Sequence, residues 1–102
     1  MSWTRVAGAD EVAVGEARVV TLAERRLAVC NTGEGIFTID DVCTHDGGSL
    51  DQGRLTGKEI ECPRHGARFD VTTGKALCLP AVRPVKTYPT RLHDGGIEVE
   101  TA

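Results

Sequence analysis

The chain has 102 residues, of which 40% are hydrophobic and 26% are charged, and its formal net charge is −3 at pH 7. This length and composition are typical of one globular domain with a modest core. Nucleic acid is an unexpected partner for a mildly acidic chain, because phosphate binding needs a clustered basic surface. No run approaches the roughly eighteen apolar residues of a membrane span, and the first residues lack a signal-peptide pattern, so we expect a cytoplasmic protein without membrane contact.

Short strands separated by turns are predicted along the whole chain, with no long helix. Residues 8–11 interrupt the first strand, and at most one turn of helix fits before Gly15. Residues 80–84 must be irregular, because proline cannot donate to a central ladder. The strands are predicted at residues 3–7, 17–22, 26–31, 36–39, 58–61, 68–71, 76–79, 85–92 and 97–101. This pattern indicates an all-β protein, built as a small antiparallel sandwich or barrel.

Two cysteine–histidine pairs lie between the predicted strands. Cys43 and His45 form a C-x-H sequence, and Cys62 and His65 form a C-x2-H sequence after sixteen intervening residues. Thiolates and neutral imidazoles are ligands of soft or borderline metals, and pairs this close in sequence converge when two loops face each other. The sequence therefore predicts a metal site. A structural zinc ion is one alternative, although such zinc sites usually group their cysteines together and their histidines together.

The two halves resemble the Rieske motif, in which a 2Fe–2S cluster has two cysteines on one iron and two histidines on the other. The likeness covers nearly the whole chain, through residues that Rieske ferredoxins place similarly: Gly47-Gly48, Pro63, Gly66, Phe69-Asp70 and Thr73-Gly74-Lys75. The resemblance implies a single Rieske domain over residues 1–102, with an inserted cluster-binding subdomain at about residues 42–80. It also implies one 2Fe–2S cluster, held by Cys43, His45, Cys62 and His65. Both histidines are then expected at an exposed tip, and Pro80 in a third loop that shields the cluster.

The reduction potential of this cluster is expected at the low end of the Rieske range. High-potential members of the family resemble C-T-H-x-G-C paired with C-P-C-H-G-S. Their additional cysteines form a loop disulfide, and their serine hydroxyl bonds to a cluster sulfide. This chain has Gly48, Arg64 and Ala67 at those positions. Each difference removes a feature that raises the potential, so we expect a value nearer about −150 mV than about +300 mV.

The glycines near the ligand pairs and the two remaining cysteines lead to further expectations. The glycines permit backbone angles and close approaches that a Cβ would obstruct, and they are Gly47, Gly48, Gly53 and Gly66. Cys30 and Cys78 lie in apolar strand-like runs, so we expect buried core thiols. The sequence leaves a disulfide between these two cysteines open.

No second reactive site is recognisable in the sequence. A terminal oxygenase also holds a mononuclear iron on two histidines and a carboxylate, but only His93 remains after the ligand pairs are assigned. Gly33 and Gly35 lack the third glycine and the following helix of a nicotinamide or flavin site. We therefore expect an electron carrier rather than an enzyme.

The resemblance implies a monomeric carrier in a multicomponent oxygenase system for aromatic compounds. Such a ferredoxin takes single electrons from a flavin-dependent reductase that oxidises NADH or NADPH, and it passes them to a terminal aromatic-ring-hydroxylating oxygenase. Two alternatives remain open at this stage. One is a Rieske-like small subunit of a nitrite reductase, and the other is a zinc-stabilised interaction module without a redox role.

Overall fold

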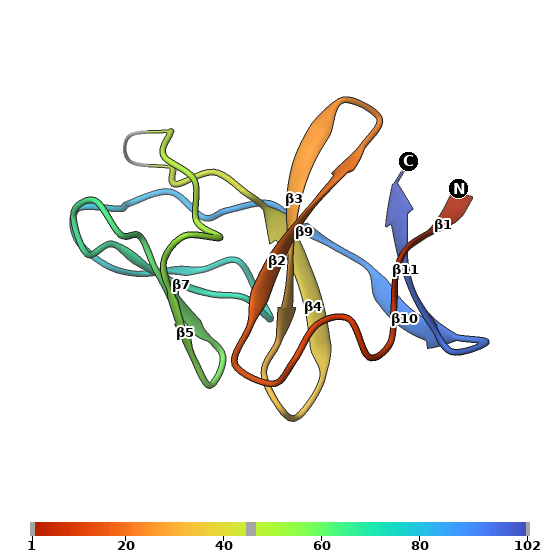
Figure 1. Ribbon diagram of the computed structural model, residues 1–102. Coiled ribbons are helices and arrows are strands. Elements are labelled where there is room, and N and C mark those ends of the chain that lie inside the picture. The colour runs from red at the N-terminus through yellow and green to blue at the C-terminus, as the bar shows by residue number, and fades with distance from the viewer. Residues whose placement is uncertain (1, 45–46, 102) are drawn as a thin grey trace.

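The computed structural model describes residues 2–44 and 47–101, which form strands and turns without a helix, as predicted. These residues accordingly include no helix of the length and apolarity needed to cross a membrane. The strands make three antiparallel sheets, ordered β1-β11-β10, β2-β3-β4-β9 and β5-β6-β7-β8 (Figure 1). Their bounds are β1 Ser2–Gly8, β2 Ala17–Leu22, β3 Arg25–Asn31, β4 Ile36–Asp40, β5 Arg54–Thr56, β6 Glu59–Glu61, β7 Arg68–Asp70, β8 Ala76–Cys78, β9 Thr87–Tyr88, β10 Thr90–His93 and β11 Gly96–Thr101.

The strand β3 is covered on both faces, which explains why its apolar run does not alternate with polar residues. Leu27, Ala28, Val29 and Cys30 are all fully buried. Ala28 and Cys30 pack in the largest core cluster, together with residues of the small sheet β5–β8. Leu27 and Val29 pack in two other clusters, which include residues of β11. Alternate side chains of a strand point to opposite faces, so each face of β3 contributes to a different part of the core.

The small sheet and the loops around it form one end of an elongated molecule, with extents of 39 × 26 × 19 Å. In Figure 1 this end lies to the left, whereas the N- and C-termini lie together at the right. The termini are close because β1 pairs with β11, with Ser2 opposite Thr101. The small sheet is packed on the central sheet, since Ile60 and Phe69 share a core cluster with Ile39.

Two local predictions differ from the structure, at residues 85–92 and at β5. The strand predicted at residues 85–92 is divided at Pro89 into β9 and β10, because proline has no N–H with which to continue a ladder. β9 pairs with β4, whereas β10 pairs with β11, so the chain passes from one sheet to another at this proline. The short strand β5 is not predicted, since three residues carry little alternation. Residues 9–15 form turns and bends, where the sequence permits one turn of helix.

Candidate metal centre

The cysteines of the predicted ligand set lie at the ends of two strands. Cys43 comes shortly after β4, and Cys62 directly follows β6. Both are buried, with 1% of their surface exposed, and both belong to the largest core cluster, so the structure brings them to one region. His65 is exposed, in agreement with the expected position at a tip. His45 lies outside the described residues, and its role as a ligand stays a prediction.

The two ligand loops, residues 43–48 and residues 62–67, share one hydrogen-bonding pattern. In the first loop, the cysteine N–H donates to the carbonyl of the last residue (2.7 Å), and the N–H of Gly47 donates to the cysteine carbonyl (2.7 Å). In the second loop, the corresponding bonds measure 2.6 Å and 3.1 Å, with Gly66 in the place of Gly47. The φ angles of these glycines are 76° and 77°, in the left-handed region that favours glycine. The described residues of the first loop, 43–44 and 47–48, are therefore arranged like their counterparts in the second, and each loop carries one cysteine.

Gly53 lies so close to the backbone of Glu61 that only a residue without a Cβ fits there. A Cβ at this position would lie 1.7 Å from the carbonyl oxygen of Glu61, the residue before Cys62. The N–H of Gly53 also donates to the carbonyl of Leu50 (3.0 Å). The chain that leaves the first ligand loop is thus in direct contact with the strand that leads into the second. The structure confirms the expected angles at Gly47 and Gly66 and the expected close approach at Gly53.

A third loop, residues 79–84, contacts the first ligand loop. The hydroxyl of Thr44 donates to the carbonyl of Arg83 (2.8 Å). Ala81 is buried in the largest core cluster, whereas Leu79 and Val82 are 76% and 75% exposed. The loop that contains Pro80 therefore lies beside the first ligand loop and presents apolar side chains to solvent.

A buried carboxylate lies behind the first ligand loop, and sequence patterns did not single it out. The side chain of Asp41 has no exposed surface. It accepts hydrogen bonds from the backbone N–H groups of Leu50 (2.9 Å) and Asp51 (2.7 Å). The signal in the sequence is weak, because an aspartate between a strand and a loop is typical of ordinary turns.

The two cysteines outside the ligand pairs are free thiols, so the structure contains no bridge between Cys30 and Cys78. Cys30 is fully buried, and this burial, with a smaller effect from the charge of Asp41, raises its pKa to about 12. Cys78 is only partly buried, and its thiol lies 3.5 Å from the carbonyl oxygen of Gly66. The prediction of a buried core thiol is confirmed for Cys30 and is wrong for Cys78, whose strand β8 is an edge strand.

The described donors suit an iron–sulfur cluster. Cys43 and Cys62 supply two buried thiols from similarly arranged loops, and His65 supplies an imidazole at the surface. Among the described residues, no three His, Cys, Asp or Glu side chains gather around one ion position. A Rieske cluster does not require such a group, because each of its irons has only two protein ligands.

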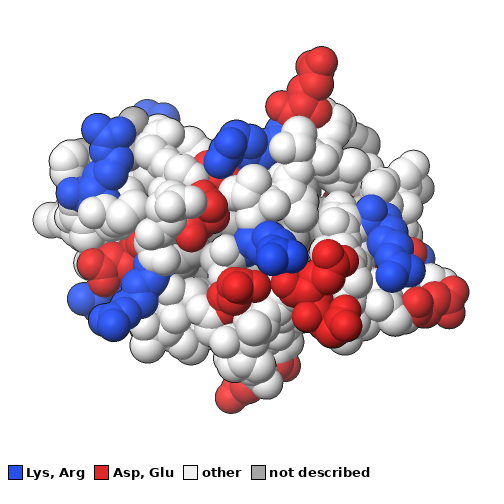
Figure 2. All heavy atoms as spheres, in the orientation of Figure 1, with Lys and Arg blue, Asp and Glu red and all other residues white. Residues whose placement is uncertain are grey.

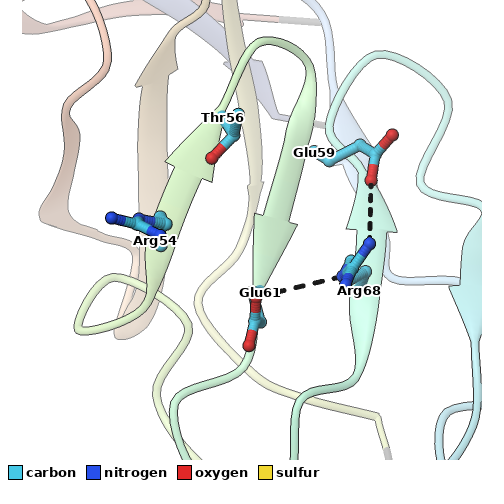
Figure 3. A pocket seen from close by; sticks show the side chains of 5 residues that line it. All are labelled: Arg54, Thr56, Glu59, Glu61 and Arg68. Atoms are coloured by element: carbon cyan, nitrogen blue, oxygen red, sulfur yellow. Dashed lines mark ion pairs between the residues drawn. The ribbon is translucent and has the colours of Figure 1, made fainter.

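A surface hollow of about 300 Å³ lies on the outer face of the small sheet, and its side chains carry opposite charges (Figure 3). Arg68 lies 3.9 Å from carboxylate oxygens of Glu59 and Glu61. Arg54 and Arg68 are the cross-strand neighbours of Glu61 on either side. Exposed pairs of this length contribute little stability. The hollow is thus lined by solvent-exposed side chains of alternating charge on three short strands.

Comparisons with known proteins decide the family. Residues 2–89 match the Rieske [2Fe-2S] domain. The chain belongs to the Rieske [2Fe-2S] family. The ferredoxin component of the naphthalene 1,2-dioxygenase system of Pseudomonas putida is 37% identical to this Rieske chain over 94 residues, which are 92% of this chain and 90% of the relative.

Solved structures of ferredoxins have the same fold. The Sphingomonas yanoikuyae B1 ferredoxin superposes with a TM-score of 0.93 at 35% identity, over 99% of this chain and 100% of that one. A chain from the complex of reduced oxygenase and oxidised ferredoxin in carbazole 1,9a-dioxygenase superposes with a TM-score of 0.90 at 34% identity, over 95% of this chain and 91% of that one. A protein described as the small subunit of an NADPH nitrite reductase by assignment only shares just the fold, at 14% identity and a TM-score of 0.84 over 99% of this chain and 100% of that one.

These comparisons confirm the predicted fold, cofactor and class of function. The Rieske ferredoxin holds one 2Fe–2S cluster, and it is an electron-transfer component rather than a catalyst. A zinc-stabilised interaction module is therefore the wrong interpretation of the cysteine–histidine pairs.

Proposed function

We propose that this Rieske ferredoxin carries single electrons from a flavin-dependent, NAD(P)H-oxidising reductase to a terminal aromatic-ring-hydroxylating oxygenase. Its similarity to ferredoxin components of dioxygenase systems supports this assignment. The observation that carries it in the structure is the pair of similarly arranged cysteine loops at one end of the molecule. We further propose that the protein works as a monomer in the cytoplasm.

The proposed cluster ligands are Cys43, His45, Cys62 and His65. The burial of both cysteines supports the thiolate pair, and the exposure of His65 supports an imidazole at the surface. When bound, the cluster supplies reversible one-electron transfer. The protein contributes loops whose internal hydrogen bonds hold the ligands in place and so limit any change of geometry between the two redox states.

We propose a single domain over residues 1–102, with residues 42–80 as the cluster-binding subdomain. The largest core cluster supports this proposal, because it joins Ala28 and Ile39 of the central sheet to Ile60 and Phe69 of the small sheet. The subdomain therefore shares its core with the scaffold and does not pack as a separate unit.

The exposed apolar side chains of the third loop support a protein partner at the cluster end. Leu79 and Val82 are each about three-quarters exposed, and Arg83 of the same loop contacts the first ligand loop. Basic and acidic side chains are interspersed on the face shown in Figure 2, without a broad area of one sign. Apolar contact at the ligand end would bring the cluster close to a partner's redox centre.

The proposal is tested by purification without oxygen, followed by iron and sulfide analysis and a redox titration. We expect a reddish-brown protein with equal molar amounts of iron and acid-labile sulfide. Its midpoint potential should be about −150 mV. A low value is expected because Ala67 has no hydroxyl to bond to a cluster sulfide, and because Gly48 and Arg64 cannot form the loop disulfide. A colourless protein would contradict the cofactor assignment, and a midpoint above about +100 mV would contradict the low-potential role.

A further inference from the structure

The carboxylate of Asp41 holds residues 49–51, the chain that leaves the first ligand loop. Asp41 follows β4 directly and precedes Cys43 by two residues. Its Oδ1 accepts the backbone N–H groups of Leu50 and Asp51. Its Oδ2 accepts the hydroxyl of Ser49 (2.7 Å) and Nη2 of Arg26 (3.2 Å). The two backbone N–H groups and Arg26 therefore donate to this carboxylate, whereas the single hydroxyl proton of Ser49 is shared between Asp41 and the Asp51 carboxylate.

The two ligand loops differ in how their ends are joined. The second loop connects β6 to β7, and the ladder between these strands closes it, with Glu61 opposite Arg68. The first loop leaves β4, which pairs with β3 and β9 and not with the returning residues 49–51. The returning chain is joined to the end of β4 through the Asp41 carboxylate instead. This side chain therefore takes the place that a strand ladder occupies in the second loop.

We propose that Asp41 is the positioning residue of the first ligand loop. By fixing residues 49–51 against the end of β4, its carboxylate sets where Cys43 lies relative to Cys62. This inference rests on the proposed ligand assignment. Its consequence is local: without Asp41 the sheets and the hydrogen bonds inside the first ligand loop remain, but the chain that leaves this loop is no longer joined to the end of β4, and the cluster that joins the loops becomes labile and distorted.

The chain offers a matched control in Asp70. As whole residues, Asp41 and Asp70 are both 6% exposed, and the exposed fractions of their side chains are 0% and 9%. Asp70 accepts hydrogen bonds from the N–H (2.8 Å) and hydroxyl (2.6 Å) of Thr72, and it pairs with Lys58 (3.5 Å). These contacts close the turn after β7 and do not involve either ligand loop. Removing Asp70 therefore deletes a comparable buried carboxylate from another part of the small sheet.

The test compares the cluster-loaded wild type with D41A, D41N and D70A. We measure the half-life of the visible absorption in the presence of an iron chelator, the electron paramagnetic resonance g-values of the reduced protein, and the thermal midpoint. Loss of two backbone hydrogen bonds to a charged acceptor is expected to shorten the half-life in D41A about tenfold or more relative to D70A. The g-values should shift in D41A and remain those of the wild type in D70A. D41N should lie between D41A and the wild type, because its amide oxygen still accepts both backbone N–H groups.

Ser49→Ala keeps the proposal testable if D41A does not fold. This variant removes the hydroxyl that bonds to the carboxylates of Asp41 and Asp51, and it is expected to shorten the half-life about fivefold. Equal half-lives and unchanged g-values in D41A and D70A would overturn the positioning role, as would a wild-type half-life in S49A if D41A does not fold. A wild-type protein that holds no cluster would overturn both this inference and the proposed function. A normal cluster in D41A would overturn only the inference.

Discussion

At the scale of single residues, the two free cysteines show how burial controls the chemistry of a thiol. Cys30 lies in β3, a strand that is covered on both faces. Burial, with a smaller effect from the charge of Asp41, raises the pKa of Cys30 to about 12. A neutral thiol is a weak nucleophile. Cys78 has a similar apolar sequence around it, but it lies on an edge strand and is partly exposed. The two thiols should therefore differ in reactivity although their local sequences are alike.

We predict that iodoacetamide at pH 8 labels Cys78 of the cluster-loaded protein and leaves Cys30 unmodified. Burial raises the pKa of Cys30 far above this pH, so its thiol remains protonated and unreactive. Peptide mass spectrometry measures the labelling of each cysteine, and labelling after unfolding shows that both peptides are detected. The variant C78S should take up no label in the native state. Labelling of Cys30 at the rate of Cys78 would contradict the buried position of β3.

At the scale of elements, the contact between Gly53 and Glu61 links the two ligand loops. Gly53 follows the first loop, and the Glu61 carbonyl belongs to the strand that leads to Cys62. The approach is so close that a Cβ cannot be accommodated without movement of the backbone of β6. Gly57, in the turn between β5 and β6, is the useful contrast. A Cβ added at Gly57 would have no other heavy atom within 4 Å, but the φ angle of this residue is 58°, in the left-handed region.

We predict that Gly53→Ala lowers the thermal midpoint more than Gly57→Ala does. A left-handed alanine costs about 1–2 kcal/mol. Displacement of packed backbone at residue 53 costs about 1–3 kcal/mol and also moves Cys62. For a domain of this size, about 1 kcal/mol corresponds to about 4–8 °C. Circular dichroism melts with parallel iron analysis check the prediction: G53A should lose cluster content, whereas G57A should retain it. Equal iron content in the two variants would show that the contact does not position the second loop.

At the scale of the whole molecule, the ligand loops and the termini occupy opposite ends (Figure 1). The exposed apolar side chains are divided in the same way. Leu79 and Val82 lie in the third loop at the ligand end, whereas Leu92, 60% exposed, lies on β10 in the sheet that contains the termini. If the partner binds at the ligand end, Leu79 and Val82 become buried in the complex and Leu92 remains exposed.

We predict that Leu79→Asp raises the dissociation constant for the terminal oxygenase about tenfold or more, whereas Leu92→Asp leaves it unchanged. The loss follows from removing an apolar side chain from the contact and placing a charge there. Isothermal titration of the oxidised ferredoxin measures the affinity, and redox titration should show the same midpoint potential in both variants. Weaker binding by L92D together with normal binding by L79D would place the partner at the other end.

Much of the candidate site was predictable from the sequence because its chemistry is local. The residue types and spacings of Cys43, Cys62 and their histidines indicate the ligand set, and the glycine four residues after each cysteine indicates the turn that surrounds it. Alternation and turn residues likewise predicted most strands, since side-chain direction has a period of two in a strand. These signals depend on neighbours in the chain, so a sequence is sufficient to read them.

The tertiary structure alone decided the features that depend on residues distant in sequence. Pro89 divides a predicted strand, but only the pairing of β9 with β4 and of β10 with β11 shows that the chain changes sheets there. Cys30 and Cys78 have similar surroundings in sequence, and only the sheet order gives one a central strand and the other an edge. Asp41 precedes Cys43, a predicted ligand, by two residues in the sequence, yet its proposed role follows from contacts with Arg26 and with residues 49–51. Burial and pairing of this kind arise when separate segments pack together, and no local pattern specifies which segments will meet.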